Sequence, residues 1–107
     1  AITVDANSVE ALKKATIELL SELFDKNKIS ENQISHVIFT TTNDLNADFP
    51  AKFARLVLGW VDVAMMCVHE LDVPNSLPMC LRVLVVVNCD DDFIPHFVYL
   101  KGASQLR

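Results

Sequence analysis

Residues 79–87 have the sequence Met-Cys-Leu-Arg-Val-Leu-Val-Val-Val, and this stretch decides the fold. A run so apolar and so rich in β-branched residues predicts a β-strand covered on both faces. Arg82 lies inside it. A guanidinium stays protonated, and moving its charge out of water costs several kcal/mol. We therefore expect Arg82 to have an anionic partner or to face a pocket that admits an anionic ligand.

A second apolar stretch, residues 63–70, precedes this one and ends in the carboxylate of Glu70. Residues 71–78 join the two stretches and contain a Pro-Asn pair, which favours a turn. The turn predicts a hairpin that brings Glu70 close to Arg82. From the residues alone, this pair is either a small site with one positive and one negative group or an internal salt bridge.

The remaining elements follow from periodicity and capping residues. Their order predicts an α+β fold, β-α-β-α-β-β-β, with one mixed sheet and the helices on one face, in a single domain over residues 1–107. The expected elements are a strand at 2–4, a helix with Asn7 as its N-cap that ends near Lys26, a capped turn at 30–33, a strand at 34–42, a helix that starts at Phe49-Pro50 and is closed by Gly59, the two strands already described, and a last strand at 97–100.

Composition bounds the possible partners. Of the 107 residues, 51% are hydrophobic, and the mean hydropathy is +0.30. A domain this small cannot bury all of them, so we expect self-association. The net charge of -5 argues against nucleic acid or an anionic membrane surface as a partner. No apolar run reaches the roughly 18 to 20 residues that a membrane span needs.

The three cysteines, Cys67, Cys80 and Cys89, lack the spacing of a disulfide scaffold. They favour a reducing compartment, and because the chain starts without a signal-peptide pattern we expect a cytoplasmic protein. They also lack a paired Cys-x-x-Cys, so buried thiols are expected instead of a zinc site. No other motif calls for a metal or a cofactor, and none is expected.

Several short motifs together resemble one family, the trimeric α/β class of monofunctional chorismate mutase, which differs from the all-helical class with the same activity. No single motif is specific, but their order and spacing along nearly the whole chain are. The matching residues are Ala-Ile-Thr-Val at 1–4, Thr-Asn-Asp-Leu at 42–45, Phe-Pro-Ala-Lys at 49–52, Arg55, Gly59-Trp60, Cys67 with Glu70, Asp72-Val73, Cys-Leu-Arg-Val at 80–83, His96, Val-Tyr-Leu at 98–100, and Leu106-Arg107.

The resemblance implies a fold related to the ferredoxin-like class and a homotrimer with active sites between subunits. It also implies the pericyclic rearrangement of chorismate to prephenate in aromatic amino acid biosynthesis, without a cofactor. In this family pattern Arg82 lies at the ether oxygen as the bond breaks, and Glu70 binds the ring hydroxyl. The other positions are Tyr99 and Arg55 around the carboxylates, Phe49 and Lys52 at the pocket edge, and Cys67 and Leu106 in the pocket lining. The family pattern also has a carboxylate-binding arginine before Ala1 and a further segment after Arg107, both outside this sequence.

Two other functions stay open at this point. One is a trimeric regulatory domain of the same fold that binds a small carboxylate at Arg82 without turnover. The other is a trimeric enamine or imine hydrolase of similar shape, which would not need the Phe-Pro-Ala-Lys and Cys-x-x-Glu patterns. For Lys52 and Arg55 the simpler interpretation is a solvated helix face.

Overall fold

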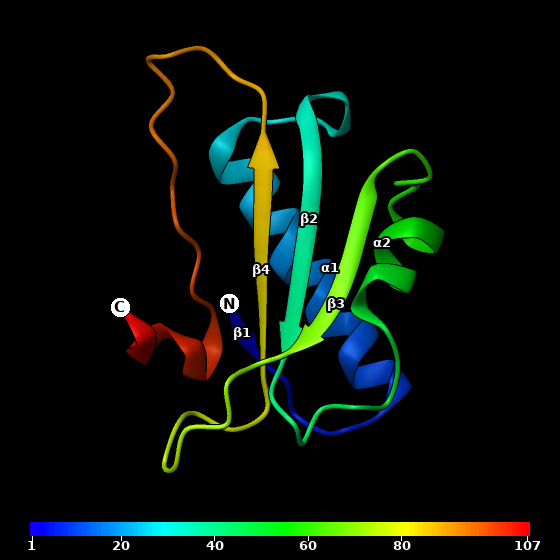
Figure 1. The fold of residues 1–107 in the computed structure, drawn as a ribbon, viewed down its shortest axis with the longest axis vertical. Helices are drawn as coiled ribbons and strands as arrows, with labels where there is room; N and C mark the ends of the chain where they lie inside the picture. The colour runs from blue at the N-terminus through cyan, green and yellow to red at the C-terminus, as the bar shows by residue number, and fades with distance from the viewer.

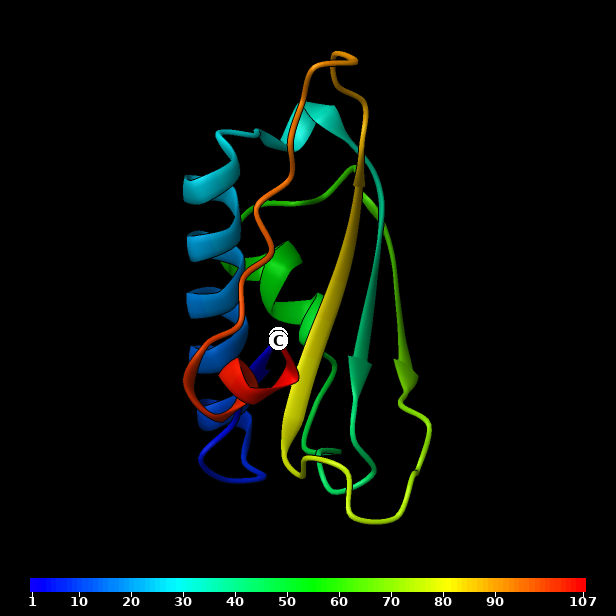
Figure 2. The ribbon, with the colours of Figure 1, turned by 90° about the vertical axis from the view of Figure 1, so that its left-hand side faces the viewer.

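The computed structural model describes residues 1–107 and has two layers, a four-stranded mixed sheet and two α-helices that cover one of its faces (Figures 1 and 2). The predicted α+β class is confirmed. None of the helices is long and apolar enough to cross a lipid bilayer. The elements are β1 (Ile2–Thr3), α1 (Val9–Asn27), the 3₁₀ helix η1 (Glu31–Gln33), β2 (Ile34–Thr41), α2 (Pro50–Val57), β3 (Ala64–His69), β4 (Cys80–Val87) and the 3₁₀ helix η2 (Lys101–Leu106).

The strand order is β1-β4-β2-β3, so β2 lies between β3 and β4. β3 pairs with β2 in parallel, whereas β4 pairs with β2 and with β1 antiparallel. The predicted β3–β4 hairpin is therefore wrong. The connection from Leu71 to Met79 passes the end of the intervening strand β2. Neighbouring strands lie about 4.8 Å apart, so the connection spans two spacings, or roughly 10 Å, and it is long enough to do so.

The helix α1 begins one residue later than the capping pattern suggested. Ser8 is the N-cap, and its hydroxyl accepts a hydrogen bond from the Ala11 N–H at 3.2 Å. Asn7 instead binds the loop before α2, because its side-chain oxygen accepts from the backbone N–H groups of Asn46 and Ala47, each at 3.0 Å. The helix ends at Asn27, close to the predicted end.

The short helix α2 has the termini that its sequence predicts. Pro50 occupies the first turn, where its missing N–H has no helical partner to lose. Gly59 follows the C-cap residue Leu58 with φ of +76°, a conformation that glycine adopts without steric cost.

The core fills the space between the helices and one face of the sheet. Leu12, Leu19 and Leu20 of α1 are buried against Val37 and Phe39 of β2, each with at most 1% of its surface exposed. Because side chains alternate along a strand, the residues between these point to the other face of the sheet. No helix covers that face, as Figure 2 shows.

We call this uncovered surface the open face. It consists of Ile38 and Thr40 of β2, Met66 and Val68 of β3, and Arg82 and Leu84 of β4. Met66 is 56% exposed and Leu84 is 58% exposed. The prediction that residues 79–87 are covered on both faces is therefore wrong for the single chain. Leu81 is buried, and Val83 and Val85 on the same side of β4 are partly buried against the core, whereas Arg82 and Leu84 between them are exposed.

The predicted last strand is also wrong. Residues 97–100 run alongside the outer edge of β4 in Figure 1 but form only one parallel bridge, between Leu100 and Ile2. The strand β1 has just two residues and so offers little backbone to pair with. The chain just before residue 97 is held by a side chain, because the Asn27 amide exchanges hydrogen bonds with the His96 backbone.

Candidate active site

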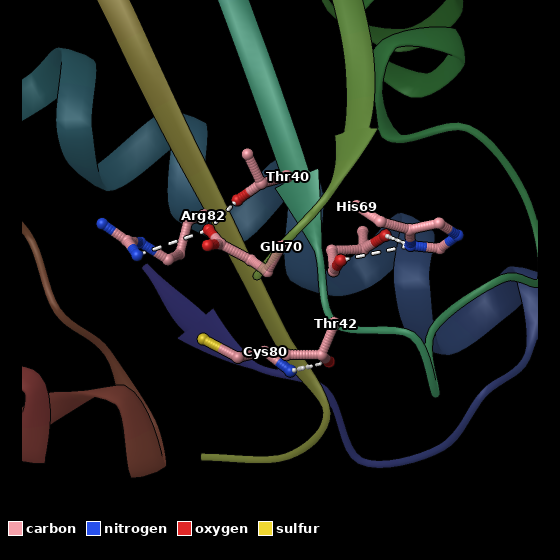
Figure 3. A network of polar contacts seen from close by, with 7 residues as sticks. Thr40, Thr42, His69, Glu70, Cys80 and Arg82 are labelled. Carbon is pink, nitrogen blue, oxygen red and sulfur yellow. Dashed lines mark hydrogen bonds and ion pairs between the residues drawn. The ribbon is translucent and has the colours of Figure 1, made fainter. Parts of the chain in front are cut away.

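Arg82 and Glu70 meet on the open face, near the end of the sheet where β2 and β3 terminate. Arg82 belongs to β4, and its Nη1 atom lies 3.3 Å from Oε2 of Glu70 (Figure 3). Glu70 directly follows β3, and its backbone N–H donates to the Thr41 carbonyl at 2.8 Å. From there its side chain reaches across β2 toward β4. The predicted proximity of the two residues is correct, although a hairpin does not produce it.

The pair is not a sealed internal salt bridge. The side chain of Arg82 is 55% exposed and that of Glu70 is 21% exposed. Both line a cavity of about 420 Å³, which we call the Arg82 pocket. Its lining residues are Ala1, Leu19, Leu23, Ile38, Thr40, Glu70, Arg82, Val83, Leu84, Phe97, Val98, Tyr99 and Arg107. Because the pair is partly exposed to solvent, it contributes little to stability. The exposure also leaves the Arg82 cation accessible to a ligand.

The C-terminal segment supplies the other wall of the Arg82 pocket. Tyr99 lies there, together with Phe97 and Arg107. The guanidinium carbon of Arg107 lies 4.6 Å from the centre of the Phe97 ring and 5.8 Å from that of Tyr99, which are cation–π distances. The pocket therefore holds two arginines. Arg107 is part of the Leu106-Arg107 match in the sequence, but that match did not predict that it lines this pocket.

Four other predicted site residues line a second cavity of about 270 Å³, which we call the Arg55 pocket. It lies between α2 and β3, and its lining residues are Phe49, Ala51, Lys52, Arg55, Met65, Met66 and Cys67. Lys52 forms an ion pair with Asp48 at 2.8 Å. The hydrogen bond from Lys52 lowers the pKa of the Asp48 carboxyl below its usual value.

The two pockets share no lining residue. The Arg82 pocket lies at the β4 side of the sheet, and the Arg55 pocket lies at the opposite edge, beside β3. Seven of the eight predicted site residues thus form two separate groups in one chain, three at the Arg82 pocket and four at the Arg55 pocket. The exception is Leu106, which lies at the end of η2, is 42% exposed and lines neither pocket.

The thiols near these pockets are poor nucleophiles. Burial raises the pKa of Cys67, against the opposing effect of a backbone hydrogen bond from Ala51. Burial likewise raises the pKa of Cys80, although the positive charge of Arg82 acts in the opposite direction. Thiolates are the reactive form, so both side chains stay neutral and unreactive near pH 7. What the Arg82 pocket offers is positive charge on a rigid sheet.

Two threonines brace the end of the sheet beneath this charge. Thr42 accepts a hydrogen bond from the Cys80 N–H at 3.0 Å, which ties the loop after β2 to the start of β4 (Figure 3). Thr42 also donates a hydrogen bond to Asp44 at 2.5 Å. Thr40 donates a hydrogen bond to Oε2 of Glu70. Sequence reasoning missed Thr40, because its position opposite Arg82 depends on strand register, which no motif encodes.

Comparison with known proteins bears directly on this site. The family model "Chorismate mutase type I" matches residues 1–107, the whole chain. The chain belongs to the type I chorismate mutase family. Chorismate mutases are isomerases, so the predicted enzyme class is confirmed.

Two curated chorismate mutases and one solved structure are similar over nearly their full length. Chorismate mutase AroH of Thermus thermophilus is 43% identical over 110 residues, covering 100% of this chain and 88% of that protein. Chorismate mutase AroH of Bacillus subtilis (strain 168) is 35% identical over 109 residues, covering 100% of this chain and 85% of that protein. A chorismate mutase structure from Clostridium thermocellum superposes with a TM-score of 0.90 at 44% identity, covering 97% of this chain and 93% of that one.

Proposed function

We propose that this chain catalyses the rearrangement of chorismate to prephenate, a step of phenylalanine and tyrosine biosynthesis. The observation that carries the proposal is the accessible guanidinium of Arg82, held by Glu70 on the wall of an open pocket. The reaction is concerted and intramolecular: one C–O bond breaks while one C–C bond forms. It needs no nucleophile, and the neutral thiols around the pockets fit that requirement.

Arg82 stabilises the negative charge that develops on the ether oxygen as its bond to carbon breaks. A positioned donor of this kind lowers the barrier because it requires no reorganisation during the reaction, and its removal costs about 3 to 4 kcal/mol. Glu70 accepts a hydrogen bond from the ring hydroxyl. Tyr99 lies on the same pocket and binds a substrate carboxylate. Together these contacts hold the substrate in a compact, reactive shape.

The remaining site residues come from a neighbouring copy of the chain. Arg55, Phe49, Lys52 and Cys67 line the Arg55 pocket, at the far edge of the sheet from Arg82. If both groups contact one substrate, the Arg82 pocket of one subunit must face the Arg55 pocket of the next. Such a head-to-tail contact forms a closed ring when the rotation between neighbouring subunits is a whole fraction of a turn. We propose a homotrimer with three shared active sites.

The open face supports this assembly. Met66, Val68 and Leu84 give the uncovered side of the sheet an apolar surface, and each is at least 44% exposed in the single chain. Exposed apolar patches on small domains mark interaction sites. Packing the open faces together removes this surface from water and brings the sheet edges of neighbouring subunits into contact.

The direct test is to add chorismate to the purified chain and to follow the loss of its absorbance. The proposal requires saturable turnover to prephenate. The main alternative is a carboxylate-binding domain of the same fold, which would bind chorismate or prephenate in a titration without consuming chorismate. Binding without turnover would therefore contradict the proposed activity and support the carboxylate-binding domain.

We also propose a cytoplasmic location. Cys67, Cys80 and Cys89 are free thiols, a state that a reducing compartment maintains. Fractionation of cells that express the native protein tests this directly. Recovery of the protein outside the cytoplasmic fraction would contradict it.

A further inference from the structure

We propose that the Thr40 hydroxyl is a positioning group that orients the Glu70 carboxylate, so that one oxygen serves Arg82 and the other faces the ligand. The inference deepens the proposed function and rests on it, since it assumes that Glu70 binds the substrate hydroxyl. Thr40 itself need not touch the substrate. Its role is to fix the side chain that does.

The sheet register places Thr40 between the two charged residues. Thr40 of β2 pairs with Arg82 of β4 on one side and with Val68 of β3 on the other. All three side chains point to the open face. Glu70 lies two residues beyond Val68, and its side chain crosses β2 so that its carboxylate lies between the Thr40 hydroxyl and the Arg82 guanidinium, as Figure 3 shows.

The two oxygens of Glu70 have different surroundings. Oε2 accepts the hydrogen bond from the Thr40 hydroxyl and also lies 3.3 Å from Nη1 of Arg82. Oε1 accepts no hydrogen bond from any group of the chain. A carboxylate has lone pairs on both oxygens, and here every protein donor uses the same one. Oε1 is therefore the oxygen that remains available to a ligand hydroxyl in the Arg82 pocket.

Arg82 alone would not fix this arrangement. The Arg82 side chain is long and 55% exposed. The Glu70 residue lies beyond the end of β3, where its backbone N–H donates one hydrogen bond, to Thr41. Thr40 differs from both, because its β-branched side chain has few rotamers and it belongs to the central strand β2. The most rigid of the three groups thus decides which carboxylate oxygen Arg82 can reach.

The test compares Thr40→Val with Thr40→Ser. Valine has the shape of threonine without the hydroxyl and suits a strand, whereas serine keeps the hydroxyl. We expect Thr40→Val to lower kcat about tenfold with little change in KM, in line with the loss of one hydrogen bond to a charged group. Thr40→Ser should restore most of the wild-type kcat. Thr40→Ala also lacks the hydroxyl but is smaller than valine, so it controls for changes in packing that valine causes. It should show the same loss of kcat as Thr40→Val.

A double-mutant cycle with Glu70→Ala provides the readout that a merely structural role would not change. If Thr40 acts through Glu70, Thr40→Val should reduce kcat in the wild-type background and have almost no effect in the Glu70→Ala background. Equal effects in both backgrounds would overturn the proposal, as would unchanged kcat in Thr40→Val. If the wild-type chain itself fails to turn over chorismate, the proposed function fails and this inference fails with it. An active wild type with additive effects overturns only the role of Thr40.

Discussion

The side-chain amide of Asn27 pairs with the backbone of His96 through two hydrogen bonds. Its Nδ2 donates to the His96 carbonyl at 2.9 Å, and the His96 N–H donates to its Oδ1 at 2.7 Å. Asn27 is only 8% exposed, and its Nδ2 also donates to the Leu23 carbonyl at 2.8 Å. The C-terminus of α1 therefore anchors the segment that carries Tyr99, at a place where no strand pairing holds it.

We expect Asn27→Ala to lower the free energy of unfolding by about 1 to 2 kcal/mol, because buried hydrogen bonds are lost. It should also raise KM for chorismate more than it lowers kcat, since Tyr99 becomes less well held. Urea denaturation and steady-state kinetics measure the two effects. Asn88→Ala is the matched control: Asn88 is exposed, and its side chain makes no hydrogen bond. An Asn27→Ala chain as stable as this control would contradict the anchoring role.

Helix and strand positions followed from the sequence wherever local signals determine them. The proline at the start of α2 and the periodicity of α1 are contained within a few residues, so they predict those elements without knowledge of the rest. Strand pairing is different, because it depends on contacts between distant residues. A proline-containing connection permits a β3–β4 hairpin, but the insertion of β2 between them depends on the burial of Val37 and Phe39 under the helices.

The interpretation of residues 79–87 as covered on both faces failed for a related reason. Both sides of β4 are rich in apolar residues, apart from Arg82 on the open face, but a single chain has helices for only one side. The second apolar side, with Leu84, needs cover that the chain itself does not supply. The sequence likewise indicated Arg82 and Glu70 as a pair, but it could not show that Thr40 lies between them or that Arg55 lies in a separate pocket.

Arg82→Lys should preserve the fold and remove most of the activity. Lysine keeps the charge, but its ammonium lacks the planar array of donors and is more strongly hydrated. Because Arg82 is half-exposed, the substitution costs little stability. We expect kcat to fall about 100-fold to 1,000-fold, the range seen when one such donor is removed. Circular dichroism checks the fold, and turnover close to that of the wild type would refute the role of Arg82.

The three thiols should differ in reactivity and in pH dependence. Cys89 is exposed, whereas burial raises the pKa of both Cys67 and Cys80 above their usual 9.0. Only the thiolate reacts, so a thiol reagent at pH 8 should label Cys89 first. Labelling of the other two should accelerate as the pH rises through 9 toward their raised pKa values. The same shifts make the folded state lose stability in that range, because it then binds more protons than the unfolded chain.

Mass spectrometry of timed labelling reactions measures each thiol separately. Fast labelling of Cys80 at pH 8 under native conditions would contradict its burial. Labelling in denaturant supplies the control, because all three thiols should then react at similar rates.

Leu84→Glu should prevent self-association without unfolding the chain. Leu84 is 58% exposed and lies opposite Ile38 on the open face, so a carboxylate there remains hydrated in a single chain. In the proposed trimer the same carboxylate would be buried among apolar groups, which is strongly unfavourable. Sedimentation velocity should show a trimer for the wild type and a monomer for the variant. Ile94→Glu is the control, since Ile94 is 77% exposed in the loop after β4, away from the open face. A wild type that stays monomeric at micromolar concentration would contradict the assembly.

Mixing two inactive variants tests whether neighbouring subunits share each site. Arg82→Ala disables the Arg82 pocket, and Arg55→Glu disables the Arg55 pocket by repelling a carboxylate. Each variant alone should be inactive, because every site contains one damaged half. After unfolding and refolding together in equal amounts, about one site in four should combine an intact Arg82 pocket from one subunit with an intact Arg55 pocket from its neighbour. The mixture should therefore recover about a quarter of the wild-type kcat per site. A mixture that remains inactive, while co-refolded wild type regains full activity, would mean that the two pockets do not act on the same substrate.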